Sequence, residues 1–183
     1  MMVLTLSACS DHDNGSATIP RRQAYPRICL YDTLYAASGL PAGFETNSSA
    51  AVIRNQAGES GSKPVWINIA YPAYEATVSC TFTPVTDDKS RQAVIENRLE
   101  RMSLNLGDRY AEQTEMTSEG GFSTIILDAK GSAVTPLQFL SAGTQWVISG
   151  AMYFNRENVN ADSVRPAIDA VKNDIIHAAK RLR

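Results

Sequence analysis

Two neighbouring stretches of the chain, residues 65–71 and 76–85, alternate between apolar and polar side chains. A period of two with β-branched and aromatic residues is typical of strands that bury one face and expose the other. The four residues 72–75 between them fit a hairpin connection. We therefore predict two antiparallel strands. Their apolar positions on one face are Ile67, Ile69, Tyr71, Val78, Cys80 and Phe82.

Further short stretches bounded by turn residues extend this sheet. Short connections between consecutive strands favour an antiparallel meander. A glycine inside the last stretch, Gly150, marks a bulge or the close approach of another element. The predicted strands are residues 50–56, 111–117, 123–129, 135–140 and 145–154, with residues 26–32 as a strand or an extended arm and residues 57–64 as a loop.

One helix is predicted after the second strand, because apolar residues recur there with helical spacing. Asp87, Asp88 or Ser90 could serve as its N-cap, and Gly107 is a natural C-terminal stop. The apolar positions of this helix are Val94, Ile95, Leu99, Met102 and Leu106.

A second helix is predicted at the end of the sequence. Asp162 or Ser163 would be its N-cap, and Pro166 suits the first turn. Its buried stripe is Ile168, Val171, Ile175, Ala179 and Leu182. The elements together predict an α+β fold in which two main helices flank an antiparallel sheet.

The composition is that of an ordinary globular domain. The chain has 183 residues, of which 44% are hydrophobic and 20% charged, and this length fits one domain with a sizeable core. The 17 basic and 19 acidic residues nearly balance and form no basic block, so nucleic acid is not an expected partner. No apolar stretch reaches the about 18 residues of a membrane-spanning helix.

The segment that precedes the domain resembles the end of a bacterial lipoprotein signal. Leu6, Ser7 and Ala8 stand before Cys9 in the order of a lipobox, in which small side chains flank the cleaved bond. The cysteine thiol would accept a diacylglycerol as a thioether and become the new N-terminus. We expect Cys9 to be the lipidation site, although a chance match within a disordered tail is the alternative.

Three regions follow from this interpretation. Residues 1–9 would be the remnant of a signal peptide, since the eight residues before the cysteine contain no Lys or Arg and a longer start is expected. Residues 10–20 are polar and partly acidic, which predicts a flexible tether. Residues 21–183 would form the single α+β domain.

The two other cysteines, Cys29 and Cys80, are a candidate disulfide, because pairing is favoured outside the cytosol. The alternative is two free thiols that pack as small apolar residues. There is no CxxC motif or Cys/His cluster, and His12 and His177 are the only histidines, so we expect no metal site and no cofactor.

No catalytic constellation stands out. His177 has no recognisable nucleophile motif beside it, Asp87 and Asp88 are explained by helix capping, and no Gly-rich phosphate loop occurs. Three aromatic residues, Trp66, Tyr71 and Tyr74, could line a ligand face on the sheet, or could pack in its core.

Four segments of the domain resemble the gliding motility lipoprotein GldD family. They are "WINIAYP" (66–72), "QFL" (138–140), "ISGAMYFN" (148–155) and the helix that runs from "DS" to "H" (162–177). The resemblance extends from about residue 20 to the end of the sequence and implies a lipidated cysteine before the domain. The order of elements is also similar to the PsbP-like fold, which is an analogy of fold alone.

The resemblance implies a lipoprotein of the Bacteroidetes cell envelope, held to the membrane by acyl chains such as palmitate and facing the periplasm or the cell exterior. Its expected function is non-enzymatic. It would be an accessory or assembly factor of the gliding machinery and of the type IX secretion system linked to it, with other envelope proteins as partners. The first alternative is a binding module for a small ligand or an envelope polymer, and the second is a hydrolase.

Overall fold

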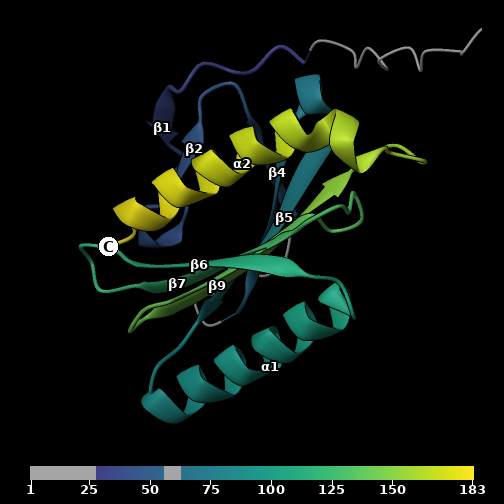
Figure 1. The fold of residues 1–183 in the computed structure, drawn as a ribbon. Coiled ribbons are helices and arrows are strands. Elements are labelled where there is room, and N and C mark those ends of the chain that lie inside the picture. The colour runs from purple at the N-terminus through teal and green to yellow at the C-terminus, as the bar shows by residue number, and fades with distance from the viewer. Residues whose placement is uncertain (1–27, 56–62) are drawn as a thin grey trace, which may run out of the picture.

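The computed structural model describes residues 28–55 and 63–183, which form one sheet between two helices (Figure 1). The main sheet has seven antiparallel strands, and a two-stranded sheet stands beside it. The strands of the main sheet are β3 (Ala51–Asn55), β4 (Val65–Tyr71), β5 (Ala76–Pro84), β6 (Ala111–Thr117), β7 (Ser123–Ala129), β8 (Leu137–Ala142) and β9 (Trp146–Phe154). The small sheet is β1 (Tyr35–Ala37) with β2 (Glu45–Asn47), the helices are α1 (Asp88–Leu106) and α2 (Ala161–Arg181), and single 3-10 turns are η1 (Pro41–Gly43) and η2 (Pro72–Tyr74).

The main sheet is assembled from two meanders. Its strand order is β3-β4-β5-β9-β8-β7-β6. The first meander runs from one edge of the sheet to its centre (β3 to β5), and the second runs from the opposite edge to the centre (β6 to β9). The two meanders meet where β5 pairs with β9 over nine residue pairs, from Ala76↔Phe154 to Pro84↔Trp146. Helix α1 connects β5 to β6, and α2 follows β9.

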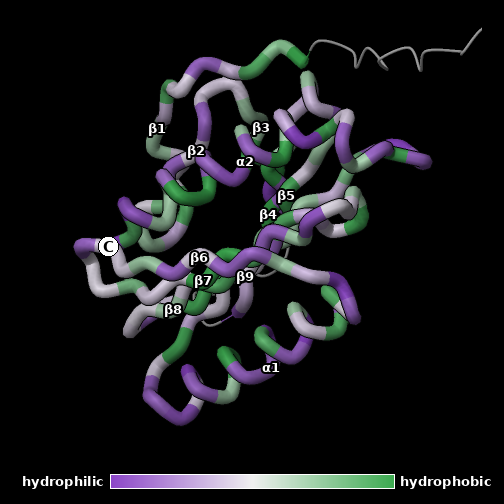
Figure 2. The backbone as a smooth tube through the Cα atoms, viewed as in Figure 1, coloured by the Kyte–Doolittle hydropathy of each residue, from purple (hydrophilic) through white to green (hydrophobic). Residues whose placement is uncertain are grey.

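The face of the sheet toward α2 carries the main core, and we call it the α2 face. The alternating positions of β4 and β5 that the sequence predicts as apolar all lie here and are buried. Figure 2 shows hydrophobic residues concentrated in the central strands. The core side chains from the sheet include Ile67, Ile69, Val78, Phe82, Ile126, Phe139 and Met152, and those from α2 include Val164, Ile168, Val171 and Ile175.

The opposite face, the α1 face, is covered only in part. Helix α1 contacts β8 and β9, where Met102 joins a small cluster with Val85, Leu140 and Val147. Met102 is the one buried residue of α1, and Leu99 of the predicted apolar stripe is exposed. The stripe is shallower than predicted because the neighbouring strands β4 and β5 present polar side chains on this face.

The predicted fold class and most element bounds are confirmed. Strands 111–117 and 123–129 have the predicted limits, and α1 has Asp87 as N-cap in a capping box with Ser90. The predicted strand 135–140 is displaced, since β8 begins at Leu137, and residues 28–32 form no strand. The predicted caps of α2 were wrong: Asn160 is the N-cap, its side chain accepting from Asp162 and Ser163, and Pro166 lies beyond the first turn.

The close approach predicted at Gly150 is confirmed. A Cβ atom built on this residue would lie 2.3 Å from Cε1 of Phe139 and 3.1 Å from Sγ of Cys80. These three residues stand side by side on β5, β9 and β8 on the α2 face. The missing side chain at Gly150 therefore makes room for the Phe139 ring in the core.

Candidate functional site

The sequence predicts lipidation or a disulfide for each of the three cysteines, and the structure describes the surroundings of two of them. Cys9 falls outside the described residues, so its lipidation stays a prediction. Cys29 is exposed and Cys80 is buried in β5, and both are free thiols, so the candidate disulfide is not formed in the structure. Burial raises the pKa of the Cys80 thiol to about 12, which keeps it protonated and unreactive.

The three aromatic residues of the candidate ligand face are not brought together. Tyr71 points to the α2 face and is buried, whereas Trp66 lies on the α1 face. Tyr74 is buried beside Tyr31, with ring centroids 4.8 Å apart, and its Oη accepts a hydrogen bond from the Tyr31 backbone N–H at 2.8 Å. Tyr71 and Tyr74 thus pack the segment before β1 onto the fold, and Trp66 alone keeps an open surface.

That open surface is the uncovered part of the α1 face. Trp66 is 48% exposed and Tyr153 is 42% exposed, and both belong to the half of the face that α1 leaves free. Between α1 and the strands lies a groove of about 200 Å³, which we call the α1 groove. Its polar lining comes from Ser79, Thr81, Gln138 and Ser149 of the sheet and from Arg98, Arg101 and Asn105 of α1. No cluster of His, Cys, Asp or Glu suited to a metal ion occurs among residues 28–55 and 63–183.

A second polar cluster is buried between α2 and the small sheet. The Tyr35 hydroxyl donates to Oδ1 of Asp174 at 3.0 Å, and the Asn47 amide donates to the same oxygen at 3.4 Å. The His177 ring stacks on Tyr35 with centroids 3.5 Å apart, and its Nε2 lies 2.7 Å from Oε2 of Glu45. The cluster therefore joins α2 to both β1 and β2.

Burial shifts the titration of this cluster. It raises the pKa of Asp174 above its ordinary value, and the hydrogen bonds from Tyr35 and Asn47 offset only part of that shift. Burial, with the hydrogen bond and the negative charge of Asp174, raises the pKa of Tyr35 to about 12. The cavity beside Asp174 measures about 10 Å³, which is hardly the size of one water molecule and leaves no room for a substrate. The arrangement thus favours a structural junction over a catalytic acid.

We expect Asp174→Asn to raise the free energy of unfolding at pH 7. A carboxyl whose pKa is raised by folding contributes stability below its ordinary pKa and loses that contribution as the pH rises through the folded value. Asparagine keeps an oxygen for Tyr35 and Asn47 but never ionises. Denaturant unfolding between pH 4 and pH 8 checks this: the advantage of the variant should grow with pH, and Asp174→Ala, without an acceptor, should lose about 1 kcal/mol. A loss of stability in Asp174→Asn at pH 7 would contradict the assignment.

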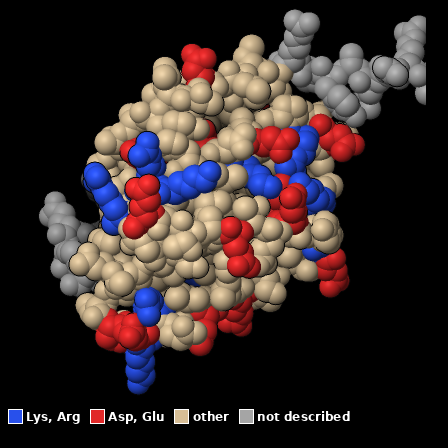
Figure 3. Space-filling view, turned by 60° about the vertical axis from the view of Figure 1, so that its left-hand side comes forward, with Lys and Arg blue, Asp and Glu red and all other residues tan. Residues whose placement is uncertain are grey.

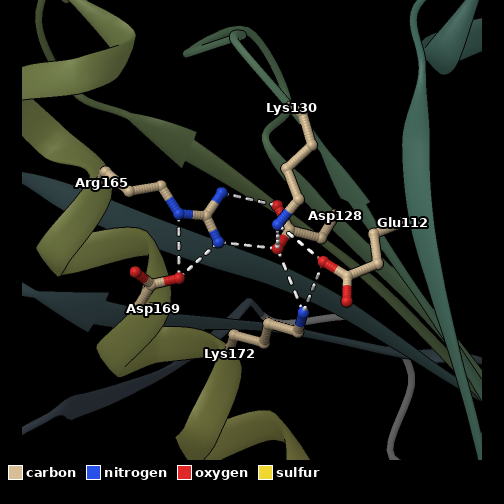
Figure 4. A network of polar contacts seen from close by, with 6 residues as sticks. All are labelled: Glu112, Asp128, Lys130, Arg165, Asp169 and Lys172. Atoms are coloured by element: carbon tan, nitrogen blue, oxygen red, sulfur yellow. Dashed lines mark hydrogen bonds and ion pairs between the residues drawn. The ribbon is translucent and has the colours of Figure 1, made fainter.

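A third cluster ties α2 to the far half of the sheet (Figure 4). Asp128 of β7 is fully buried, and both of its carboxylate oxygens accept from Arg165 of α2, at 2.7 and 2.6 Å. Its Oδ2 also accepts from Lys130 at 2.8 Å and Lys172 at 3.1 Å. Around this centre, Glu112 pairs with Lys130 at 2.7 Å and Asp169 pairs with Arg165.

The charges in this cluster satisfy one another. Burial alone would raise the pKa of Asp128, but the hydrogen bonds from Arg165, Lys130 and Lys172 outweigh it and hold that pKa well below its usual range. Three cations face three carboxylates, so no unpaired charge is offered to a ligand. Figure 3 shows the same mixing of basic and acidic side chains over the visible surface. The cluster therefore stabilises the packing of α2 on the sheet.

The sequence interpretation did not single out these clusters or the α1 groove. Asp128 follows Ile126 at a core position of its strand, and Asp174 falls in the apolar stripe of α2. A carboxylate at a position whose periodicity predicts burial requires hydrogen-bonding or charged partners. That requirement was the signal available in the sequence for Asp128 and Asp174. The sequence carried no signal that Arg98 and Arg101 line one groove with strand hydroxyls, because this depends on how α1 lies against the sheet.

Comparison with known proteins places the chain in one family. The sequence model of the gliding motility lipoprotein GldD family matches residues 15–183, which is nearly the whole chain. No curated protein and no solved structure matches, so the PsbP-like likeness stays a prediction. No helix among the described residues is long and apolar enough to cross a membrane. The family description names a lipoprotein, which implies anchoring in the cell envelope, and a process, gliding motility, without an enzymatic activity. The match over residues 15–183 shows that the chain belongs to the gliding motility lipoprotein GldD family.

Proposed function

We propose that this protein is a lipid-anchored, non-enzymatic accessory factor that helps to assemble the gliding machinery and the type IX secretion system linked to it. The observation that carries the proposal is the family match, which extends from residue 15 to residue 183. The matched region begins six residues after Cys9, so the domain would hang from the lipidated cysteine on the short polar tether of residues 10–20.

The anchor follows from the chemistry of the lipobox. The sulfur of Cys9 would carry a diacylglycerol as a thioether, and acyl chains such as palmitate add about 0.8 kcal/mol of membrane affinity for each buried methylene group. Two or more chains hold a protein stably at a membrane, whereas one chain binds reversibly. The folded domain would then lie at the membrane surface, on the periplasmic or the outer side, where it would contact other envelope proteins.

The body would act by contact rather than by catalysis. Within each of the two buried polar clusters of the domain, the charged and polar groups bind one another. Asp128 accepts from Arg165, and Asp174 accepts from Tyr35 and Asn47. The cavity beside Asp174 is too small for a substrate. Saturated clusters of this kind hold α2 on the sheet and support a rigid docking body. Crosslinking in whole envelopes, followed by capture of this protein, would identify the partners that the proposal requires.

Complementation of a gliding strain that lacks the gene tests the anchor. We expect the gene with its natural secretion signal to restore colony spreading and secretion, and Cys9→Ala to restore neither, because the unlipidated protein leaves the membrane. Cys29→Ala is the matched control, since Cys29 is exposed and unpaired in the structure, and it should behave like the wild type. Intact mass of the purified protein checks the lipid. Full spreading and secretion with Cys9→Ala would refute the anchor, and normal spreading without the gene would refute the accessory role.

A binding module for an envelope polymer is the second candidate. The exposed Trp66 and the open half of the α1 face favour it, in a form that no longer includes the buried Tyr71 and Tyr74.

A further inference from the structure

We propose that the α1 groove binds an acidic saccharide, with Arg98 and Arg101 on its anionic group and the hydroxyl side chains of β5 and β9 on its sugar hydroxyls. Among the residues that line the groove are Ser79, Thr81, Arg98, Arg101, Ser149 and Tyr153. The inference rests on the second candidate function above and names its ligand. It shares with the accessory role only the location of the domain in the cell envelope.

Within the part of the chain that the structure describes, the two arginines of the groove lack the carboxylate partner that Arg91, Arg156 and Arg165 have. Arg165 and Arg91 each pair with a carboxylate, whereas Arg98 and Arg101 form no ion pair within residues 28–55 and 63–183. Arg101 donates only to Oδ1 of Asn97, at 3.2 Å. The two guanidinium groups stand three residues apart on α1 and line the same groove. Burial and the positive charge of Arg101 lower the pKa of Arg98, as expected for close like charges. An anion between them would relieve this repulsion.

The strand side of the groove supplies hydroxyl groups. Thr81 of β5 stands opposite Ser149 of β9, and Ser79 stands opposite Ala151, one step further along the same two strands. Ser79 donates to Oδ1 of Asn68 at 2.9 Å, which leaves its oxygen to accept from a ligand. A floor of small hydroxyl side chains beside two guanidinium groups can hydrogen-bond to both the hydroxyls and the acid of a charged sugar.

Two exposed aromatic rings border this floor. Trp66 pairs with Thr81 across β4 and β5, and Tyr153 pairs with Thr77 across β9 and β5. Because Thr77 and Thr81 are four residues apart on one strand, the rings are displaced by about 13 Å along it. Flat aromatic faces at both ends of a polar surface suit the apolar C–H faces of sugar rings, and Trp and Tyr combine an apolar body with a polar tip.

An acidic peptide fits this groove less well than a saccharide. The backbone of β5 is already paired with β4 on one side and β9 on the other, so the floor offers no free strand edge for a peptide to extend. With about 200 Å³, the groove is also smaller than the about 300–1,000 Å³ of sites that enclose drug-sized ligands. It therefore suits one charged sugar unit of a longer chain that runs over Trp66 or Tyr153.

A larger hollow near the end of the sheet is a weaker candidate. It measures about 500 Å³ and is lined by residues 133–135, 153–154 and 156–159. Its arginine, Arg156, already pairs with Glu75 at 3.0 Å. The charge there is satisfied within the protein, whereas the charge in the α1 groove is not.

Titration of the full 183-residue chain with oligogalacturonate tests the inference. We expect binding that weakens with salt, and about a tenfold or greater loss of affinity in the double variant Arg98→Gln/Arg101→Gln, because two charge-assisted hydrogen-bonding groups are removed. Arg91→Gln is the matched control on the same helix, since Arg91 is paired with Asp88 outside the groove, and its affinity should be unchanged. Circular dichroism confirms that each variant is folded.

Two further ligands decide the chemical class. The methyl ester of the same oligosaccharide, which has no charge, should bind at least about tenfold more weakly, and oligoglutamate should bind more weakly than oligogalacturonate. Equal or tighter binding of oligoglutamate would assign the groove to acidic peptides and overturn the saccharide proposal. Absence of oligogalacturonate binding, or equal loss in Arg91→Gln, would also overturn it. Either result would leave the complementation test of the accessory role unaffected.

Discussion

Asp128→Asn is expected to lower the free energy of unfolding at pH 7 by about 3 kcal/mol, the lower end of the cost of breaking a buried ion pair. The variant removes the negative charge at the centre of the cluster, while Arg165 and Lys172 remain partly buried with 30% and 15% of their side chains exposed. Denaturant unfolding followed by circular dichroism measures the loss. Asp169→Asn is the matched control, because Asp169 is half exposed and its pair with Arg165 should contribute less than about 1 kcal/mol.

The same variant carries a pH signature. A carboxylate whose pKa is lowered by folding contributes stability above its ordinary pKa of about 4 and loses it only as the pH falls toward the folded value. The difference between wild type and Asp128→Asn should therefore stay constant from pH 8 to pH 5 and shrink in stronger acid. A difference that already disappears near pH 6, or an equal loss in Asp169→Asn, would show that Asp128 is not the centre of the cluster.

Gly150→Ala is expected to destabilise the protein by about 2 kcal/mol through overpacking of the core. The new methyl group would lie 2.3 Å from the Phe139 ring, and both residues are on the α2 face beneath α2. Phe139 is fully buried and cannot swing outward, so either the ring or β9 must shift. Thermal and denaturant unfolding measure the loss.

The reason for this loss can be tested by a double-mutant cycle. Phe139→Leu removes the ring atoms that the new methyl group would meet, so Gly150→Ala should cost less in that background than in the wild type. Additive losses would place the strain elsewhere in β9 and contradict the close packing of Gly150 and Phe139.

The sequence pattern predicted the helices and strands of this fold better than the contacts that these elements make with one another. Period-two alternation in β4 and β5 places Ile67 and Phe82 on the buried face because a strand alternates whatever it pairs with. Helix caps are also local, and Asp87 was identifiable from its own neighbourhood. Asn160 was missed because several polar residues precede α2, and only the backbone conformation distinguishes which of them is the cap.

The candidate site required contacts between distant parts of the chain. Asp128 meets Arg165 across 37 residues, and Tyr35 meets Asp174 across 139 residues, separations that no local pattern records. The candidate face of Trp66 and Tyr71 failed for a simple reason, since residues five apart on one strand point to opposite faces. Membership of the family was accessible from the sequence because it rests on the whole chain.

The seam between β5 and β9 has a consequence for how this chain reaches its native state. Each meander can form from neighbours in sequence, but the central pair joins residues as far apart as Ala76 and Phe154. Closing so long a loop costs entropy before any contact rewards it, which slows folding. Until β9 pairs with β5, the inner edge of β5 exposes unpaired backbone groups that can pair with non-native strands. The central strand β5 is therefore protected from non-native pairing only after the last third of the chain has folded.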